Sequence, residues 1–253
     1  MFKPRMSAIS TVRSNPHHST EDERHVTLAL TMTDRTISEQ LFESLCSGKA
    51  IPCRKIPTGL SKTPDYEIVL GFQRVAVEVK QLDENEQDKG VNRALDAGRD
   101  TGGVTAPTSR LRKKIAEGYR QLKAVARDGQ PCLLVVYNNS GFLNFIDAFT
   151  VTTAMFGSFG VRLGLTTKGY PEVIRQGFMD KQKITRNTCK RLSAIGVLKA
   201  ANSRSLELVI YHNPYAVAPI QPATITALAA SQFLHPDPHS GNFVTWEPPS
   251  IEA

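Results

Sequence analysis

Three charged residues lie close together in the stretch KTPDYEIVLGFQRVAVEVKQ, residues 62–81. Asp65 follows a proline and precedes one apolar run, while Glu78 and Lys80 lie two residues apart in the next. These side chains suit a metal-dependent phosphodiesterase. Carboxylates bind a divalent cation, and a lysine orients or helps to deprotonate the attacking water, or stabilises the charge that builds on the phosphorus.

A β-hairpin would bring the three side chains together. Gly71-Phe72 has the composition of a two-residue loop, with glycine at the first position of a type II′ turn. With that loop, Asp65 lies directly opposite Glu78, with the Cβ atoms roughly 5 Å apart. Lys80 shares the face of Glu78, whereas the two valines that flank Glu78 point to the other face. The spacing therefore predicts three charged groups on one side of a strand pair.

Two carboxylates at this separation repel each other and raise each other's pKa unless a cation neutralises them. Magnesium fits, since one or two carboxylates hold it while water and a substrate phosphate complete its octahedron, and we expect Mn²⁺ to substitute. The alternative is that Glu78 and Lys80 face solvent on an edge strand and that Asp65 merely begins a strand. A change of one residue in the loop would remove the pairing.

The elements around this stretch predict an α/β fold. Apolar periodicity predicts helices over residues 36–48 and from 108 or 109 to about 127, and PCLLVVYNN (131–139) is typical of a strand buried on both faces. Residues 81–107 are polar and aperiodic, which indicates a long loop or a weak helix. FIDAFTVTTAMFG suggests a further helix, and GVRLGL, RLSAIGVLKA and LELVIYH suggest strands. We expect a mixed central sheet with helices on both sides, in which the strand after the helical crossover is parallel.

The length of 253 residues fits one domain with extensions. We expect a flexible tail over 1–32, an α/β domain over 33–215 and a Pro-rich arm over 216–253, packed on the surface with a short helix near ITALAASQF. No apolar run is long enough to span a membrane. The cysteines form no C-x-x-C pair, which favours a reducing compartment, and we expect the cytoplasm.

The chain is basic, with a net charge of +7 and a pI near 9.3, which favours a polyanionic partner. Seven basic residues and one acid lie between Arg110 and Arg127, and a second basic stretch runs from Lys181 to Arg191. Such a helix face is often only solvated; beside a phosphodiesterase site it would contact phosphates. The residues we expect to bind nucleic acid are Arg110, Lys113, Lys114 and Arg120.

The stretch CRKIPTGLSKTPDYEIVLGFQRVAVEVKQ resembles the PD-(D/E)xK nuclease superfamily, which includes restriction endonucleases, Holliday-junction resolvases and repair nucleases. The resemblance covers residues 36–139. It implies a restriction-endonuclease-like α-β-β-β-α-β core, here with extra C-terminal strands. It also implies that Asp65 and Glu78 bind the metal and that Lys80 activates water.

Many members of this superfamily add an acid from the first helix. Glu39 is the better match here and Glu43 is the alternate. Gln81, directly after the motif, and Gln121, in the basic helix, resemble accessory positions of other members.

These observations predict a Mg²⁺-dependent endonuclease that hydrolyses nucleic acid, DNA rather than RNA. A second hypothesis is a nucleic-acid-binding or assembly protein with the same fold and an idle site. The sequence leaves open whether the protein is a homodimer, which target it cuts, and whether it serves restriction, repair, recombination or defence.

Overall fold

The structure is a computed structural model that describes residues 35–57, 63–100, 107–125, 129–140, 146–202, 205–237 and 239–247. The described residues belong to one compact unit, and the predicted tail (1–32) lies outside them. The helices are α1 (Ile37–Gly48), α2 (Glu86–Asp96), α3 (Pro107–Val125), α4 (Ala148–Phe156) and α5 (Pro222–Ile225). The strands are β1 (Cys53–Lys55), β2 (Tyr66–Leu70), β3 (Gln73–Leu82), β4 (Cys132–Asn138), β5 (Ser158–Leu165), β6 (Pro171–Met179), β7 (Ala194–Asn202), β8 (Ser205–His212), β9 (Ser231–Pro236) and β10 (Phe243–Thr245).

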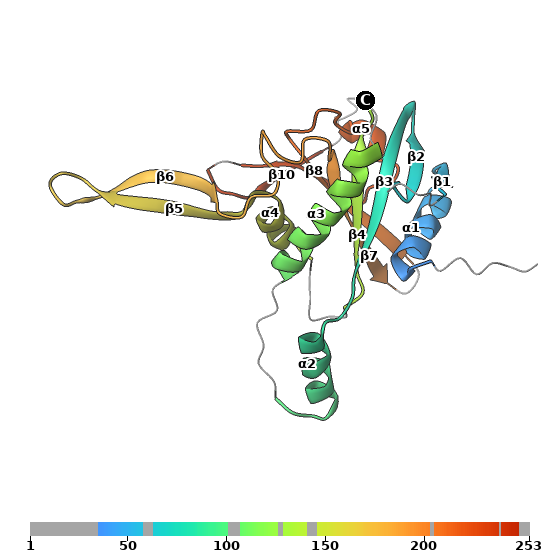
Figure 1. The fold of residues 1–253 in the computed structure, drawn as a ribbon, viewed down its shortest axis with the longest axis horizontal. Coiled ribbons are helices and arrows are strands. Elements are labelled where there is room, and N and C mark those ends of the chain that lie inside the picture. Colours follow the sequence, from blue (N-terminus) through green and yellow to red (C-terminus); the bar gives the residue numbers. More distant parts are fainter. Residues whose placement is uncertain are drawn as a thin grey trace, which may run out of the picture. The chain divides into compact units, whose positions relative to one another are not determined.

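Eight of these strands form one mixed sheet in the order β1-β2-β3-β4-β7-β8-β9-β10 (Figure 1). The pairs β1–β2 and β2–β3 are antiparallel, whereas the pairs β3–β4 and β4–β7 are parallel. The chain crosses from β3 to β4 through α2 and α3. This confirms the predicted α/β class, the antiparallel hairpin and the parallel strand after a helical crossover.

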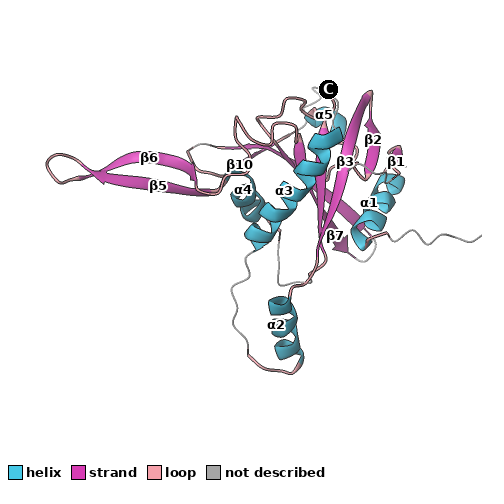
Figure 2. Ribbon diagram, viewed as in Figure 1, coloured by secondary structure: helices cyan, strands magenta, loops and turns pink. Residues whose placement is uncertain are grey.

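Helices cover both faces of the sheet (Figure 2). Helices α3 and α4 pack on one face, together with Ala76 and Leu82 of β3. Helix α1 packs on the other, where its Phe42 lies among Val77 and Val79. Strand β4 contributes alternate residues to both clusters, which confirms that it is buried on both faces. The even-numbered side chains of β3, among them Glu78 and Lys80, therefore point toward the α3 face.

The segment 81–107 contains a helix, α2, where the sequence predicts a long loop or a weak helix. Asn85 and Asp88 form a capping box at its start, with hydrogen bonds of 2.8 Å and 3.1 Å. Asp88 is its buried residue. Because the capping side chains rather than an apolar stripe stabilise this helix, apolar periodicity does not reveal it.

The Pro-rich segment contributes strands to the main sheet rather than only a surface arm. Where the sequence predicts a short helix near ITALAASQF, the structure has α5 and then β9, which pairs with β8 in parallel. Strand β10 pairs with β9. Phe233 stacks on Tyr211 at 5.0 Å and Phe243 packs against both rings, so aromatic burial holds these strands in place.

Two further results concern the middle of the chain. Helix α4 and the strands β5, β7 and β8 lie where the sequence predicts them, whereas β6 is not predicted because proline, glutamate and glycine interrupt its apolar pattern. No helix among the described residues is both long and apolar enough to cross a bilayer.

Candidate functional site

The hairpin β2–β3 has the predicted register. Leu70 pairs with Gln73 and Tyr66 pairs with Val77, so the next position along the ladder sets Asp65 opposite Glu78. Gly71 has a φ of +59°, and Phe72 is not among the described residues with positive φ, as a type II′ turn requires. The loop chemistry therefore fixes which charged residues face each other.

A backbone hydrogen bond holds Asp65 in place. Its Oδ2 accepts from the N–H of Val79 at 2.8 Å, directly across the strand pair. Burial raises the pKa of Asp65, while this hydrogen bond and the charge of Lys80 oppose the increase. One carboxylate oxygen is thus engaged by the sheet itself, and the carboxyl group is fixed beside Glu78.

Glu78 is the most unusual group in this region. Its side chain is 0 % exposed, and neither carboxylate oxygen has a hydrogen bond of good geometry within the described chain. Lys80 Nζ lies 2.5 Å from Oε1, and the backbone N–H of Asp65 acts on the carboxylate as a further donor that lowers its pKa. Burial, followed by the charge of Asp65, raises the pKa of Glu78 to about 7, and Lys80 opposes that increase. Buried carboxylates are ordinarily fully hydrogen-bonded, so Glu78 can accept a further cationic or donor partner beside Lys80.

The residue types and the incompletely hydrogen-bonded carboxylate of Glu78 fit a magnesium ion. Asp65 and Glu78 supply two adjacent carboxylates, and Mg²⁺ characteristically takes one or two, together with water and phosphate. Among the described residues, no group of three or more His, Cys, Asp or Glu side chains could hold a metal. We call Asp65, Glu78 and Lys80 the charged cluster.

The predicted acids of the first helix are engaged elsewhere. Glu39 is part of a capping box, where its Oε2 accepts from the N–H of Thr36 at 2.8 Å, and its Oε1 lies 2.8 Å from Lys55 Nζ. The pKa of Glu39 is lowered: burial would raise it, but the bonds to Lys55 and Thr36 outweigh burial. Its charge still acts on Asp65, raising that pKa.

Glu43 contacts residues outside the charged cluster. Its Oε1 accepts from the hydroxyl of Tyr66 at 2.8 Å, and its Oε2 lies 2.6 Å from Arg35. Glu43 thus anchors α1 to β2. Of the two acids, Glu39 is the one that remains in electrostatic reach of Asp65.

Gln81 joins α1 to the end of β3. Its Oε1 accepts from the N–H of Ser38 at 3.0 Å, and its Nε2 donates to Asp83 at 2.5 Å. Asp83, which the sequence reasoning did not select, also accepts from Asn139 at 2.9 Å, and this bond is the main cause of its lowered pKa. Gln121 is half-buried on α3, with no polar contact to the charged cluster in the described chain.

The four basic residues expected to bind nucleic acid differ in their surroundings. Arg110 Nη1 lies 2.7 Å from Asp88, so it ties α3 to α2. Lys113 and Arg120 are exposed, and Lys114 is half-buried. Lys113 and Arg120 are therefore the members of this set most available to a phosphate.

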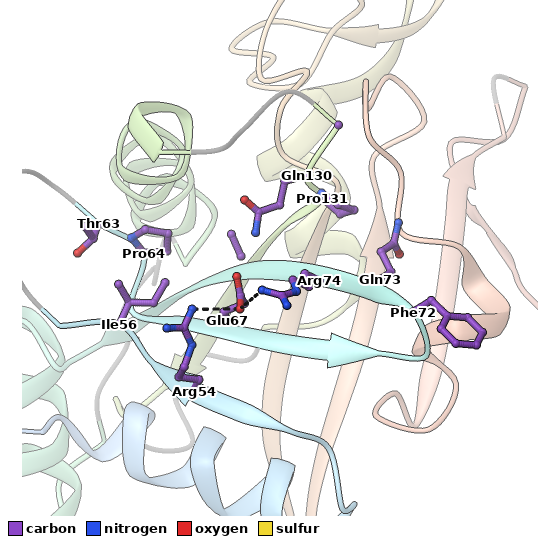
Figure 3. Close-up of a pocket in the computed structure, with 12 residues that line it drawn as sticks. Arg54, Ile56, Thr63, Pro64, Glu67, Phe72, Gln73, Arg74, Gln130 and Pro131 are labelled. Atoms are coloured by element: carbon purple, nitrogen blue, oxygen red, sulfur yellow. Dashed lines mark hydrogen bonds and ion pairs between the residues drawn. The ribbon is translucent and has the colours of Figure 1, made fainter.

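An open groove is lined by residues of β1, of the β2–β3 hairpin and of the segment before β4 (Figure 3). It has a volume of about 590 Å³, and Pro64, Glu67 and Ala76 line it, each within two residues of Asp65 or Glu78 along the chain. Two arginines at its rim, Arg54 and Arg74, lie 3.1 Å and 3.6 Å from Glu67. The sequence reasoning missed both, although the hairpin register places Arg54 opposite Glu67 once β1 is known.

Comparisons with protein-family models, with curated proteins and with solved structures each found no match. The functional interpretation therefore rests on the residues of the site, on their geometry and on the order of the elements that carry them.

Proposed function

We propose that the protein is a magnesium-dependent endonuclease that hydrolyses phosphodiester bonds in nucleic acid, DNA rather than RNA, in the cytoplasm. The observation that carries the proposal is the fully buried Glu78, whose carboxylate oxygens lack hydrogen bonds of good geometry in the described chain, opposite Asp65 and beside Lys80. Such a cluster is costly in a sheet unless a cation binds it. The described cysteines are all free, which agrees with the expected compartment.

The order of the elements supports the nuclease proposal. The order α1-β1-β2-β3-α3-β4 is the α-β-β-β-α-β order that the resemblance to the PD-(D/E)xK superfamily implies, with α2 inserted before α3. Asp65 precedes β2, and Glu78 and Lys80 lie within β3, as the superfamily's motif requires. The extra strands β7 to β10 extend the sheet on the β4 side.

Each residue of the cluster has a separate role in this proposal. Asp65 and Glu78 would hold Mg²⁺, which would neutralise their charges, polarise the scissile phosphate and lower the pKa of a bound water. Lys80, already oriented by Glu78, would donate to the attacking water or to a phosphate oxygen. Glu39 would add a third carboxylate if Lys55 released it. Arg54 and Arg74 would bind a phosphate next to the scissile one.

Cleavage assays test the proposal directly. We expect the purified protein to cut supercoiled or linear DNA with Mg²⁺ or Mn²⁺ and to be inactive in EDTA. Lys80→Ala, Glu78→Gln and Asp65→Asn should each abolish cleavage. The two carboxylate variants each remove a charged metal ligand, and Lys80→Ala removes the catalytic ammonium group. Glu86→Gln, on an exposed residue of α2, is the matched control and should cut normally. RNA and single-stranded DNA assayed in parallel decide the preferred substrate.

Two results would refute the proposal. One is the absence of metal-dependent cleavage on every form of DNA and RNA. The other is normal cleavage by Lys80→Ala.

The second candidate function is a nucleic-acid-binding or assembly protein with an idle site. The ion pair between Lys80 and Glu78 favours it, because it neutralises one carboxylate without a metal. This hypothesis predicts salt-sensitive binding of nucleic acid without cleavage. It also predicts that Asp65→Ala binds as tightly as the parent protein.

A further inference from the structure

Strands β5 and β6 form a hairpin that belongs to no other sheet. Figure 1 shows this hairpin, in yellow and orange, extending away from the main sheet. Only its base packs on the core: Phe178 lies 5.2 Å from Phe159 and 5.7 Å from Phe156, ring centre to ring centre. A two-stranded ribbon is marginally stable in water by itself, so the ordered base must support the rest.

One face of the ribbon is apolar and exposed to solvent. The register pairs Leu163 with Val173 and Leu165 with Pro171, so these side chains share a face with Val161. The exposed fractions of Val161, Leu163, Leu165 and Val173 lie between 50 % and 73 %. A contiguous apolar patch of this kind marks a surface that binds a partner.

The opposite face carries two arginines, together with Glu172, which pairs with Gly164, and Ile174, whose side chain lies over Gly164. Arg162 lies directly across from Arg175, and both are exposed. Neither forms an ion pair in the part of the chain that the structure describes, where Arg175 donates only to a backbone carbonyl at 3.4 Å. Like charges directly opposite each other destabilise a strand pair, so a bound anion would stabilise this one.

The charge continues beyond the ribbon. Residues 158–191 carry eight basic residues and two acids, a net charge of +6 in a chain whose total is +7. Arg175 and Arg186 both line a cavity of about 420 Å³ at the base of the hairpin. A positively charged segment therefore includes the ribbon and continues past its base.

We infer that the β5–β6 hairpin is an arm that binds duplex DNA in a groove. The inference rests on the proposed function, because it supplies the substrate of that site. The major groove admits a two-stranded ribbon. The apolar face would lie against base edges and thymine methyl groups. Arg162 and Arg175, with their long side chains, would reach the phosphates at the walls of the groove.

A binding experiment without divalent metal separates this inference from the nuclease proposal. Fluorescence anisotropy of the full chain with a labelled duplex in EDTA gives the Kd and its salt dependence. For Arg162→Gln/Arg175→Gln we expect the Kd to rise roughly tenfold and the salt slope to fall by about two. Arg93→Gln/Arg99→Gln, which removes the same charge from exposed positions elsewhere, should bind nearly as the parent does. Equal loss in the two double variants would overturn the inference.

A second variant removes the ribbon as a whole. Gly160 and Gly177 are paired directly, so an Asn-Gly turn in place of residues 161–176 closes the ladder at its base. We expect an unchanged melting temperature and the same loss of affinity. Undiminished affinity would contradict the inference. If the parent binds through the ribbon yet never cleaves, the nuclease proposal fails, whereas the inference that the ribbon binds DNA still holds.

The apolar face has its own test. We expect Leu163→Ser/Val173→Ser to weaken duplex binding while the molecular mass measured by sedimentation stays the same. If this variant instead converts a dimer to a monomer and binds DNA normally, the face belongs to a second copy of the chain and the inference is wrong.

Discussion

Lys80 Nζ lies 2.5 Å from Oε1 of Glu78, a carboxylate with no exposed surface. Asp65 is opposite this pair, so the charged cluster holds two carboxylates and one ammonium group. With both carboxylates ionised, the cluster carries a net negative charge within the layer between α3 and the sheet. A proton on Glu78 or a bound cation would remove that charge, and the raised pKa of Glu78 shows that the proton competes for the position.

The first prediction concerns the ion pair. Lys80→Met leaves Glu78 buried without its cation and should destabilise the fold by roughly 3–5 kcal/mol near pH 8. The double variant Lys80→Met/Glu78→Gln should recover most of that loss, because no charge is left buried. Urea unfolding of both single variants and the double variant gives the coupling energy. Lys89→Met, which breaks an exposed pair with Glu86, should leave the stability nearly unchanged. A small cost for Lys80→Met would show that Glu78 is protonated or hydrated.

The second prediction is a pH dependence of stability without metal. The pKa of Glu78 is raised to about 7 from 4.5, so the folded protein binds a proton that the unfolded chain releases. Its contribution to stability is present below pH 4.5 and is lost as the pH rises through 7, on the order of 3 kcal/mol in all. Asp65, also raised, acts in the same direction.

Glu78→Gln should remove most of this decline, so that the variant melts above the parent at pH 8 and close to it at pH 5. His212 acts in the opposite direction, because burial lowers its pKa. The difference between parent and variant therefore isolates Glu78. Parallel melting curves across this pH range would refute the assignment.

The third prediction concerns metal binding, independently of cleavage. Mg²⁺ or Mn²⁺ should raise the melting temperature, and more at pH 8 than at pH 6, because the ion competes with the proton on Glu78. Calorimetry in two buffers should detect proton release near neutral pH. Asp65→Asn and Glu78→Gln should remove the shift, and Glu86→Gln should retain it. A shift that survives loss of both carboxylates would place the ion elsewhere.

The sequence predicts the hairpin well and its surroundings less well, for a physical reason. Gly71-Phe72 determines a register locally, so the pairing of Asp65 with Glu78 follows from counting residues. The partner of Glu39 does not follow, because β1 is a three-residue strand with no period to reveal it, and only the folded sheet places Lys55 beside α1. Long-range contacts also determine the position of β9, which pairs with β8 and packs on Tyr211 through Phe233.

The last prediction separates the charge of Asp65 from its hydrogen bond. Asp65→Asn keeps an acceptor for the N–H of Val79, whereas Asp65→Ala leaves that buried N–H without one. Both variants should lower the pKa of Glu78, since the charge of Asp65 is the second cause of its increase. Only the alanine variant should also lose stability, by roughly 1–3 kcal/mol.

Carbon-13 NMR of labelled glutamate carboxyl groups measures the pKa, and urea unfolding measures the stability. Glu67→Gln is the matched control, because Glu67 is the next acid along β2 and pairs with Ala76 rather than with Glu78. It should leave the titration of Glu78 unchanged. If Glu78 still titrates near 7 in Asp65→Asn, burial alone raises its pKa. The two carboxylates would then be too weakly coupled to share one ion.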